Sequence, residues 1–295
     1  NYAIQIAPTA IKDQANNLFA GITNDATWNF TTAATAAIPG LVLWLDASDA
    51  STMTMNGTTV NEWRDKMGSS AKMTRTSGTP TVVASGIGGK PTVNFTASSS
   101  SSMRDGVNHS GPVTVFYVSR QTGGSNGRVL TAIDNNWLLG YHGGYRNRAY
   151  LEGWVIVDSQ TPSDTNPHLY ATTIGGSGQN STVWAEGTQI ASNQIGTQGP
   201  NNLNLGGDAW GEFSDCDISE VLVYNRVLLP SELDEIGTYL TVKYSLTTSY
   251  WPTADTTAPT ISTLDPADNA TGVAVGANLV ATFSEPIAIG TGDIT

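Results

Sequence analysis

The sequence has little cysteine, little charge and no long apolar run, and each shortage excludes a class of protein. Cys216 is the single cysteine, so no intrachain disulfide can form. No stretch of about 18 apolar residues occurs, so the sequence predicts no membrane-spanning helix. The three histidines are scattered, and H-E-x-x-H, G-x-S-x-G and phosphate-loop motifs are absent. These absences argue against a zinc site and against the corresponding enzymes.

Charge is scarce and mostly negative. Charged residues make up 13% of the chain, the formal net charge is −12, and the 13 basic residues are scattered. Nucleic acids and anionic membranes need clusters of basic residues, so neither is an expected partner. An acidic, charge-poor surface fits neutral partners such as glycans, or Ca²⁺, which prefers carboxylate and carbonyl oxygens. The chain starts abruptly within a strand-like run, which indicates a piece of a longer secreted or cell-surface protein.

What the sequence does contain is a series of short strand-like runs. Examples are LVLWLDA at 41–47, VTVFYV at 113–118 and DISEVLVY at 217–224. Clusters of Gly, Asn, Ser and Pro separate them at short intervals, and the chain holds 31 glycines. This pattern is typical of an all-β sandwich with many tight turns.

One segment changes from the strand period to the helical period. In PSELDEIGTYLTVKYSL, apolar residues recur at Leu233, Ile236, Leu240 and Tyr244. Pro230 suits the first turn of a helix, and acidic residues follow it. The sequence therefore predicts one amphipathic helix of about three to four turns that packs on the sandwich.

The central region resembles a known family. LVLWLDASDAST, VNEWRDKMG and KPTVNF at its front, with DISEVLVYNRVLLPSELDEIGTYLTVKYSL at its back, resemble bacterial laminin-G-like domains of the concanavalin jelly-roll type. The resemblance covers 39–250 and implies a jelly roll of two facing antiparallel sheets. It also implies a ligand-binding module, commonly for carbohydrate, that often carries a structural Ca²⁺.

The flanking segments resemble a second family. Residues 256–295 are similar to the opening of a bacterial immunoglobulin-like domain, and residues 1–34 are similar to the close of one. Neither half has enough strands to bury its apolar face alone. We expect the halves to form a partial immunoglobulin-like sandwich, either within one chain or by head-to-tail self-association between chains.

Aromatic and polar residues gather in two glycine-rich stretches. Sugars present apolar C–H faces ringed by hydroxyls, and proteins meet them with aromatic rings and nearby polar groups. Tyr150 lies in the first stretch, and Trp137 and Trp154 lie in strand-like runs that could equally place them in the core. The predicted glycan-binding residues are Trp137, Tyr141, His142, Tyr145, Arg146, Trp154 and Trp210.

Four aspartates are candidate ligands for a structural Ca²⁺. Asp46 and Asp49 follow the first strand of the predicted jelly roll, and Asp215 and Asp217 begin its last strand. Carboxylates from these strands can meet, because the first and last strands of a jelly roll tend to be neighbours. The alternative is that all four are ordinary turn-forming, solvated aspartates.

Two further groups of residues are candidates for catalysis. A retaining glycosidase needs two carboxylates about 5 Å apart on one sheet face. Asp215 and Asp217 share strand parity, whereas Glu220 joins that face only if a bulge intervenes. YHGGYRNRAY at 141–150 offers Tyr, His and Arg for a polysaccharide lyase, including Arg148, but resembles no lyase motif of this fold.

Three functions therefore compete. The favoured one is a non-catalytic, lectin-like module for carbohydrate binding or cell adhesion. The second is a structural spacer in a repetitive surface protein. The third is a polysaccharide-degrading enzyme, either a lyase or a glycosidase.

Overall fold

The chain divides into two compact units in the computed structural model. One unit comprises Thr35–Thr253, and the other combines Asn1–Ala34 with Ala254–Thr295. The structure describes residues 2–3, 29–30, 38–151, 153–155, 161–196, 198–207, 209–250, 261–267, 270–271, 278 and 280–283.

The larger unit is made of antiparallel strands. In chain order they are β3 (Leu41–Asp46), β4 (Met53–Asn56), β5 (Thr59–Arg64), β6 (Lys72–Ser77), β7 (Thr81–Val83), β8 (Thr92–Phe95), β9 (Ser102–Arg104), β10 (Val113–Gln121), β11 (Leu130–Ala132), β12 (Trp137–His142), β13 (Tyr145–Leu151), β14 (His168–Ile174), β15 (Gly176–Ala185), β16 (Thr188–Gly196), β17 (Leu203–Leu205) and β18 (Cys216–Tyr224). Short 3₁₀ helices are η2 (Ala50–Thr52), η3 (Ile87–Gly89), η4 (Ala97–Ser99) and η5 (Ala209–Gly211).

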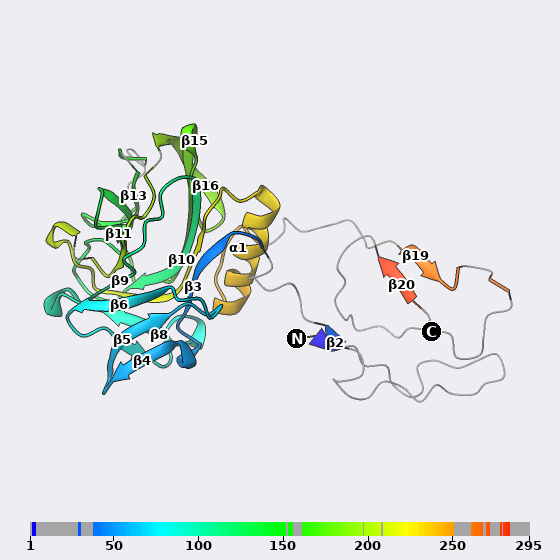
Figure 1. The fold of residues 1–295 in the computed structure, drawn as a ribbon, viewed down its shortest axis with the longest axis horizontal. Coiled ribbons are helices and arrows are strands. Elements are labelled where there is room, and N and C mark those ends of the chain that lie inside the picture. Colours follow the sequence, from blue (N-terminus) through cyan, green and yellow to red (C-terminus); the bar gives the residue numbers. More distant parts are fainter. Residues whose placement is uncertain are drawn as a thin grey trace. The chain divides into compact units, whose positions relative to one another are not determined.

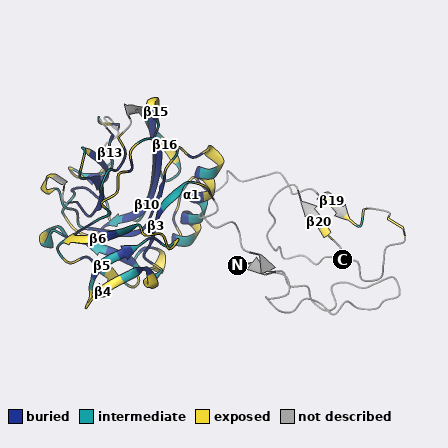
Figure 2. Ribbon diagram, in the orientation of Figure 1, coloured by how far each residue is buried: buried dark blue, intermediate teal, exposed yellow. Residues whose placement is uncertain are grey.

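These strands form one continuous hydrogen-bonded path. Its order is β13-β12-β11-β17-β9-β6-β5-β7-β8-β18-β10-β14-β15-β16, with β3 beside β18 and β4 beside β5. The path folds over on itself, because Leu130 and Trp137 from its first strands share a core with Val115 and Tyr117 of β10. The result is the predicted β-sandwich. Figure 2 shows its central strands buried and β4 largely exposed.

The helix α1 (Pro230–Tyr244) covers the outer face of the β10-containing layer. Phe116 and Val118 alternate with the first-core residues of β10 and pack against Leu233, Ile236 and Leu240 in a second core. In Figure 1, α1 lies on one side of β10, and β11 and β13 lie on the other. The predicted single amphipathic helix is confirmed, and it is the one α-helix of the described residues.

A buried ion network joins α1 to the sandwich. Lys243 Nζ lies 2.7 Å from Asp46 Oδ2 on β3 and 2.6 Å from Glu220 Oε2 on β18. Burial raises the pKa of Glu220, and although burial also acts on Asp46, the ammonium groups of Lys243 and Lys66 hold the pKa of Asp46 below its ordinary value. The network fixes the helix over the pair of strands that close the jelly roll.

The smaller unit contains two short ladders. The strand β1 (Tyr2–Ala3) pairs with β2 (Asn29–Phe30), and β19 (Ile261–Asp265) pairs with β20 (Val280–Phe283). No strand pairing joins the two ladders among the described residues, and most of 1–34 and 256–295 lies outside those residues. The composite sandwich therefore stays a prediction. None of the helices in the described ranges has the length and hydropathy of a membrane span.

Candidate ligand-binding surface

The β12–β13 hairpin carries most of the residues predicted to bind a ligand. It turns at Gly143 and Gly144, whose φ angles of 61° and 89° suit glycine. Strand residues alternate between two faces, so Trp137 and Tyr141 both point into the first core and are fully buried. These two side chains cannot contact a ligand on the surface, and their assignment to the site is corrected to core.

The opposite face of the hairpin is formed by aromatic and basic side chains. Trp154 follows β13 and forms a β-bridge with Tyr150. Its ring lies 5.5 Å from the His142 ring and 5.3 Å from the Tyr150 ring, centre to centre. Trp154 remains 38% exposed, so it is a surface side chain and not part of the core.

Arg148 extends this cluster along β13. Its guanidinium carbon lies 4.7 Å from the centre of the Tyr145 ring and 5.2 Å from that of Trp154. Both separations are within the range of cation–π attraction. The side chain therefore links Tyr145, near the turn of the hairpin, to Trp154.

Trp210 lies in the second glycine-rich loop and is the most exposed large apolar residue of the described part of the chain. It is 68% exposed, and its φ of +63° is unusual for any residue other than glycine. Gly207 and Gly211 flank it with φ angles of 112° and 73°. The Arg128 guanidinium lies 5.9 Å from its ring centre.

Glu212 connects the Trp210 loop with the hairpin. One of its oxygens lies 2.5 Å from Arg128 Nε, and the other lies 3.2 Å from His142 Nε2. Burial acts to raise the pKa of Glu212, but hydrogen bonds from Arg128 and His142 outweigh it and hold that pKa below its ordinary value. The carboxylate is thus ionised and bridges two parts of one surface.

We call this set the aromatic surface. It joins two stretches of sequence, and Arg128 and Glu212 belong to it without having been predicted from the sequence. The aromatic surface comprises Arg128, His142, Tyr145, Arg148, Tyr150, Trp154, Trp210 and Glu212.

Arg146 belongs to a different cluster. Its Nη1 lies 2.9 Å from His168 Nδ1, and its Nε lies 3.4 Å from Asp164 Oδ2. Tyr170 and Glu186 complete this polar group at the ends of β14 and β15. The guanidinium is held by these neighbours, so the structure does not bring Arg146 to the aromatic surface.

The four aspartates predicted to bind Ca²⁺ do not form one ligand set. The first and last strands do pair, with Asp46 opposite Glu220. However, two lysine ammonium groups contact Asp46 Oδ2, and Asp49 accepts hydrogen bonds from Ser51. Ca²⁺ takes six to eight oxygen ligands, whereas Asp46 and Asp49 are bonded to lysine and serine donors.

Asp215 and Asp217 are similarly engaged. Asp215 accepts hydrogen bonds from the backbone N–H groups of Ala97 and Ser125, at 2.9 and 3.0 Å. Asp217 is buried and bonds Asn94 and Arg120. The donors that surround these carboxylates do not fit a calcium ion, and no group of metal-ligating side chains was found among the described residues.

The carboxylates that a glycosidase would need also accept hydrogen bonds from neighbouring side chains. The register shift between β10 and β18 leaves Ser219 as an extra residue, so Asp217 and Glu220 both point away from the first core. Glu220 is nevertheless buried and accepts hydrogen bonds from Trp44 Nε1 and the Tyr244 hydroxyl, at 2.6 and 2.7 Å. The Tyr141 hydroxyl of the lyase alternative belongs to a core residue.

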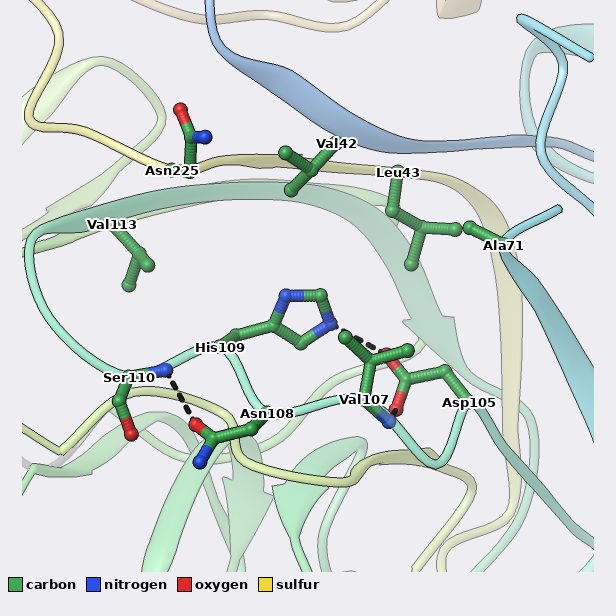
Figure 3. A pocket seen from close by; sticks show the side chains of 10 residues that line it. All are labelled: Val42, Leu43, Ala71, Asp105, Val107, Asn108, His109, Ser110, Val113 and Asn225. Atoms are coloured by element: carbon green, nitrogen blue, oxygen red, sulfur yellow. Dashed lines mark hydrogen bonds and ion pairs between the residues drawn. The ribbon is translucent and has the colours of Figure 1, made fainter. Parts of the chain in front are cut away.

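A separate cavity of about 240 Å³ lies between β3, the start of β6 and the loop after β9. Figure 3 shows His109 pointing into it, between Val113 and Val107, with Nε2 toward Asp105 at 2.6 Å. Its lining is mostly apolar and shares no residue with the aromatic surface. Neither residue of this pair belongs to a recognisable sequence motif, so the pair could not be predicted from the sequence.

Comparison with known proteins identifies one end of the chain. Residues 255–295 match the family model of a bacterial Ig-like domain. This match agrees with the resemblance of the C-terminal flank. No curated protein matches the sequence at a significant level.

Several solved structures are similar to part of this chain. The binding domain of Paraclostridial Mosquitocidal Protein 1 is 16% identical, with a TM-score of 0.49, over 68% of this chain and 52% of that one. Domain 4 of AbnA, an extracellular arabinanase from Geobacillus stearothermophilus solved with arabinotriose, is 16% identical, with a TM-score of 0.48, over 67% and 98%.

A third similar structure is that of botulinum neurotoxin type C, described by its dependence on two ganglioside molecules for cell entry. It is 10% identical, with a TM-score of 0.45, over 68% of this chain and 51% of that one. The chain thus spans about half the length of the two toxin structures. At these identities and scores, the likeness carries no information on ligand or activity.

Proposed function

We propose that the larger unit is a non-catalytic carbohydrate-binding module of a secreted or cell-surface protein, with its ligand on the aromatic surface. One observation carries the proposal. Trp210 is 68% exposed in a left-handed backbone conformation, and Arg128, Glu212 and His142 connect it to the exposed ring of Trp154. The resemblance to laminin-G-like domains agrees with this proposal but remains a prediction.

The physical reason is that Trp210 contributes little to the stability of the fold. A large apolar ring in water contributes little to folding, and a left-handed conformation costs a residue with a side chain about 1–2 kcal/mol. Strained backbone of this kind clusters at functional sites. An exposed, preorganised ring is suited to pack against the apolar face of a pyranose, while Glu212 and His142 offer polar groups for its hydroxyls.

The shape of the site favours an extended ligand. The aromatic residues lie on the outer face of a hairpin and on a neighbouring loop, and the cavity beside His109 is lined by other residues. A surface of this kind contacts several units of a polysaccharide chain and does not enclose a single small molecule.

Catalysis is not part of the proposal. Asp217 and Glu220, which a glycosidase mechanism would need, are held in structural hydrogen bonds. A structural spacer is the second candidate function, and the match of residues 255–295 to a bacterial Ig-like domain favours it. Such domains fit a tandem arrangement in which the jelly roll would only separate its neighbours.

Binding to a panel of soluble polysaccharides, measured by isothermal titration calorimetry, tests the proposal. Trp154→Ala and Trp210→Ala should each weaken binding at least tenfold, because an aromatic–sugar contact is lost. Val242→Ala removes an exposed apolar group on α1 and should change nothing.

The controls separate the three functions. A folded wild-type protein that binds no polysaccharide supports the spacer. Unchanged affinity in both tryptophan variants places the site elsewhere. New reducing ends or unsaturated uronates after incubation would reveal an enzyme.

A further inference from the structure

The guanidinium of Arg148 contacts aromatic rings, whereas other arginines of the protein bond to oxygen atoms. Among the described residues, its guanidinium lies over two aromatic rings, those of Tyr145 and Trp154. Within the described ranges no oxygen accepts a hydrogen bond from its guanidinium, and its Nε is buried without a partner. Arg148 as a whole residue is half-buried, so part of it is accessible to solvent.

Oxygen partners are the rule for arginine elsewhere in this protein. Arg128 pairs with Glu212 and Arg120 with Asp217, for example. In all, six arginines besides Arg148 donate to carboxylate, carbonyl, amide or hydroxyl oxygens: Arg64, Arg75, Arg120, Arg128, Arg146 and Arg226. In a chain with a net charge of −12, carboxylates are plentiful, and Arg148 still has none among the described residues.

Ring contacts satisfy only part of a guanidinium. Cation–π attraction acts on its flat faces, whereas its N–H groups point outward in the plane and still need acceptors. The two rings also restrict where the side chain can move, so little conformational entropy remains to be lost on binding. Such a group is preorganised for a planar or tetrahedral anion that accepts two N–H bonds at once.

We propose that the aromatic surface recognises an acidic glycan, in which an anionic group on the sugar bonds to Arg148 while a neighbouring ring packs on Trp154. This inference rests on the carbohydrate-binding function proposed above. A uronate carboxylate or a sulfate ester can supply the anion. The Glu212 carboxylate does not compete for Arg148, because Arg128 and His142 hold it.

Matched pairs of polysaccharides that differ in charge test the inference. The carboxylate arm compares polygalacturonate with its methyl ester, and hyaluronan with chitin oligosaccharides. The sulfate arm compares dextran sulfate with dextran. We expect at least one acidic member to bind about tenfold or more tightly than its neutral partner, and this preference to fall as salt is added. The arm that shows the preference identifies the acid group.

Two arginine variants locate the effect. Arg148→Gln should abolish the preference, with a loss of about 10- to 100-fold for the acidic glycan and little change for the neutral one. Arg148→Lys should recover part of it, because charge returns without the planar fork. Arg75→Gln removes the same charge from an exposed site on β6 and should keep the preference.

The outcomes distinguish a failure of the acidic-glycan inference from a failure of the carbohydrate-binding function. If glycans bind and both tryptophan variants lose them, but no acidic member is preferred or Arg148→Gln keeps the preference, the acidic-glycan inference is overturned and the binding function stands. If no glycan of either kind binds, both fall. Melting temperatures of the variants close to the wild-type value confirm that a lost preference does not reflect unfolding.

Discussion

Replacement of Trp210 by glycine separates a ligand-binding tryptophan from a structural one. A tryptophan kept for stability should be buried in relaxed backbone, whereas Trp210 is 68% exposed at a φ of +63°. Glycine adopts this backbone conformation without strain. We therefore expect Trp210→Gly to fold nearly as stably as the wild type while it loses glycan affinity.

The magnitude follows from the exposed fraction. A tryptophan can bury about 250 Å², so the buried third of Trp210 contributes roughly 80 Å², or about 2 kcal/mol at 25 cal/mol per Å². Relief of the left-handed conformation returns about 1–2 kcal/mol, and the greater freedom of glycine in the unfolded chain costs about 0.4–1 kcal/mol. The net destabilisation is about 1–2 kcal/mol or less.

Trp137 supplies the contrast. It is fully buried in the first core, so Trp137→Ala should cost about 3–5 kcal/mol through lost contacts and a cavity. For a domain of this size, each kcal/mol shifts the melting temperature by about 2–4 °C. Calorimetry should therefore show a small shift for Trp210→Gly and a shift of about 10 °C for Trp137→Ala.

The reasoning fails in either of two ways. A melting temperature for Trp210→Gly as low as that of Trp137→Ala would make Trp210 structural. A stable variant with unchanged polysaccharide affinity would show that the exposed ring has another role.

Other predictions concern the ion network and the metal. Lys243→Met leaves Asp46 and Glu220 without their shared cation and should cost about 3–5 kcal/mol in urea denaturation, whereas the exposed Lys90→Met should cost nothing measurable. The lowered pKa of Asp46 means that its ionised form stabilises the fold above its unfolded value of 3.8 and that this contribution is lost as pH falls through the lower folded value. The stability difference between wild type and Asp46→Asn should accordingly shrink as pH falls below 3.8, and a constant difference would contradict the shift. Because the four candidate aspartates are engaged elsewhere, added Ca²⁺ or chelator should leave the melting temperature unchanged, and a rise with Ca²⁺ would reveal a site formed by other residues.

The local sequence pattern was sufficient to predict the all-β class and the single helix. β10 and β18 contain short apolar runs that are buried on both faces, and the helical spacing from Leu233 to Tyr244 matches α1. The pattern could not have corrected the site in the same way. Leu138 and Leu139 are both apolar and have opposite parity, so the sequence of β12 does not show which face carries Trp137 and Tyr141 into the core.

Contacts between residues that are distant in the sequence could not be predicted from the local pattern of apolar and polar residues. The His142–Glu212 contact spans 70 residues, and the Lys243–Asp46 bond spans 197. Sequence composition shows that an aspartate is present but not which cation neutralises it, so Asp46 could be assigned to Ca²⁺ as readily as to lysine. The bulge at Ser219 likewise depends on pairing with β10 and has no local signature.

The position of the aromatic surface is related to which sheet faces are covered by the core or by α1. One face of the β10 layer closes the first core, and α1 with Lys243 covers the other, so neither is open to a ligand. The strand β13 ends the hydrogen-bonded path, and Thr161 and Ser163 bond its start and the preceding turn, which protects part of this edge from pairing with another chain. The outward face of β12 and β13 is open, and it carries the exposed Trp154. A ligand can approach there over rings and a guanidinium that the hairpin holds in place, and for this reason we assign binding to this face and not to the apolar cavity beside His109.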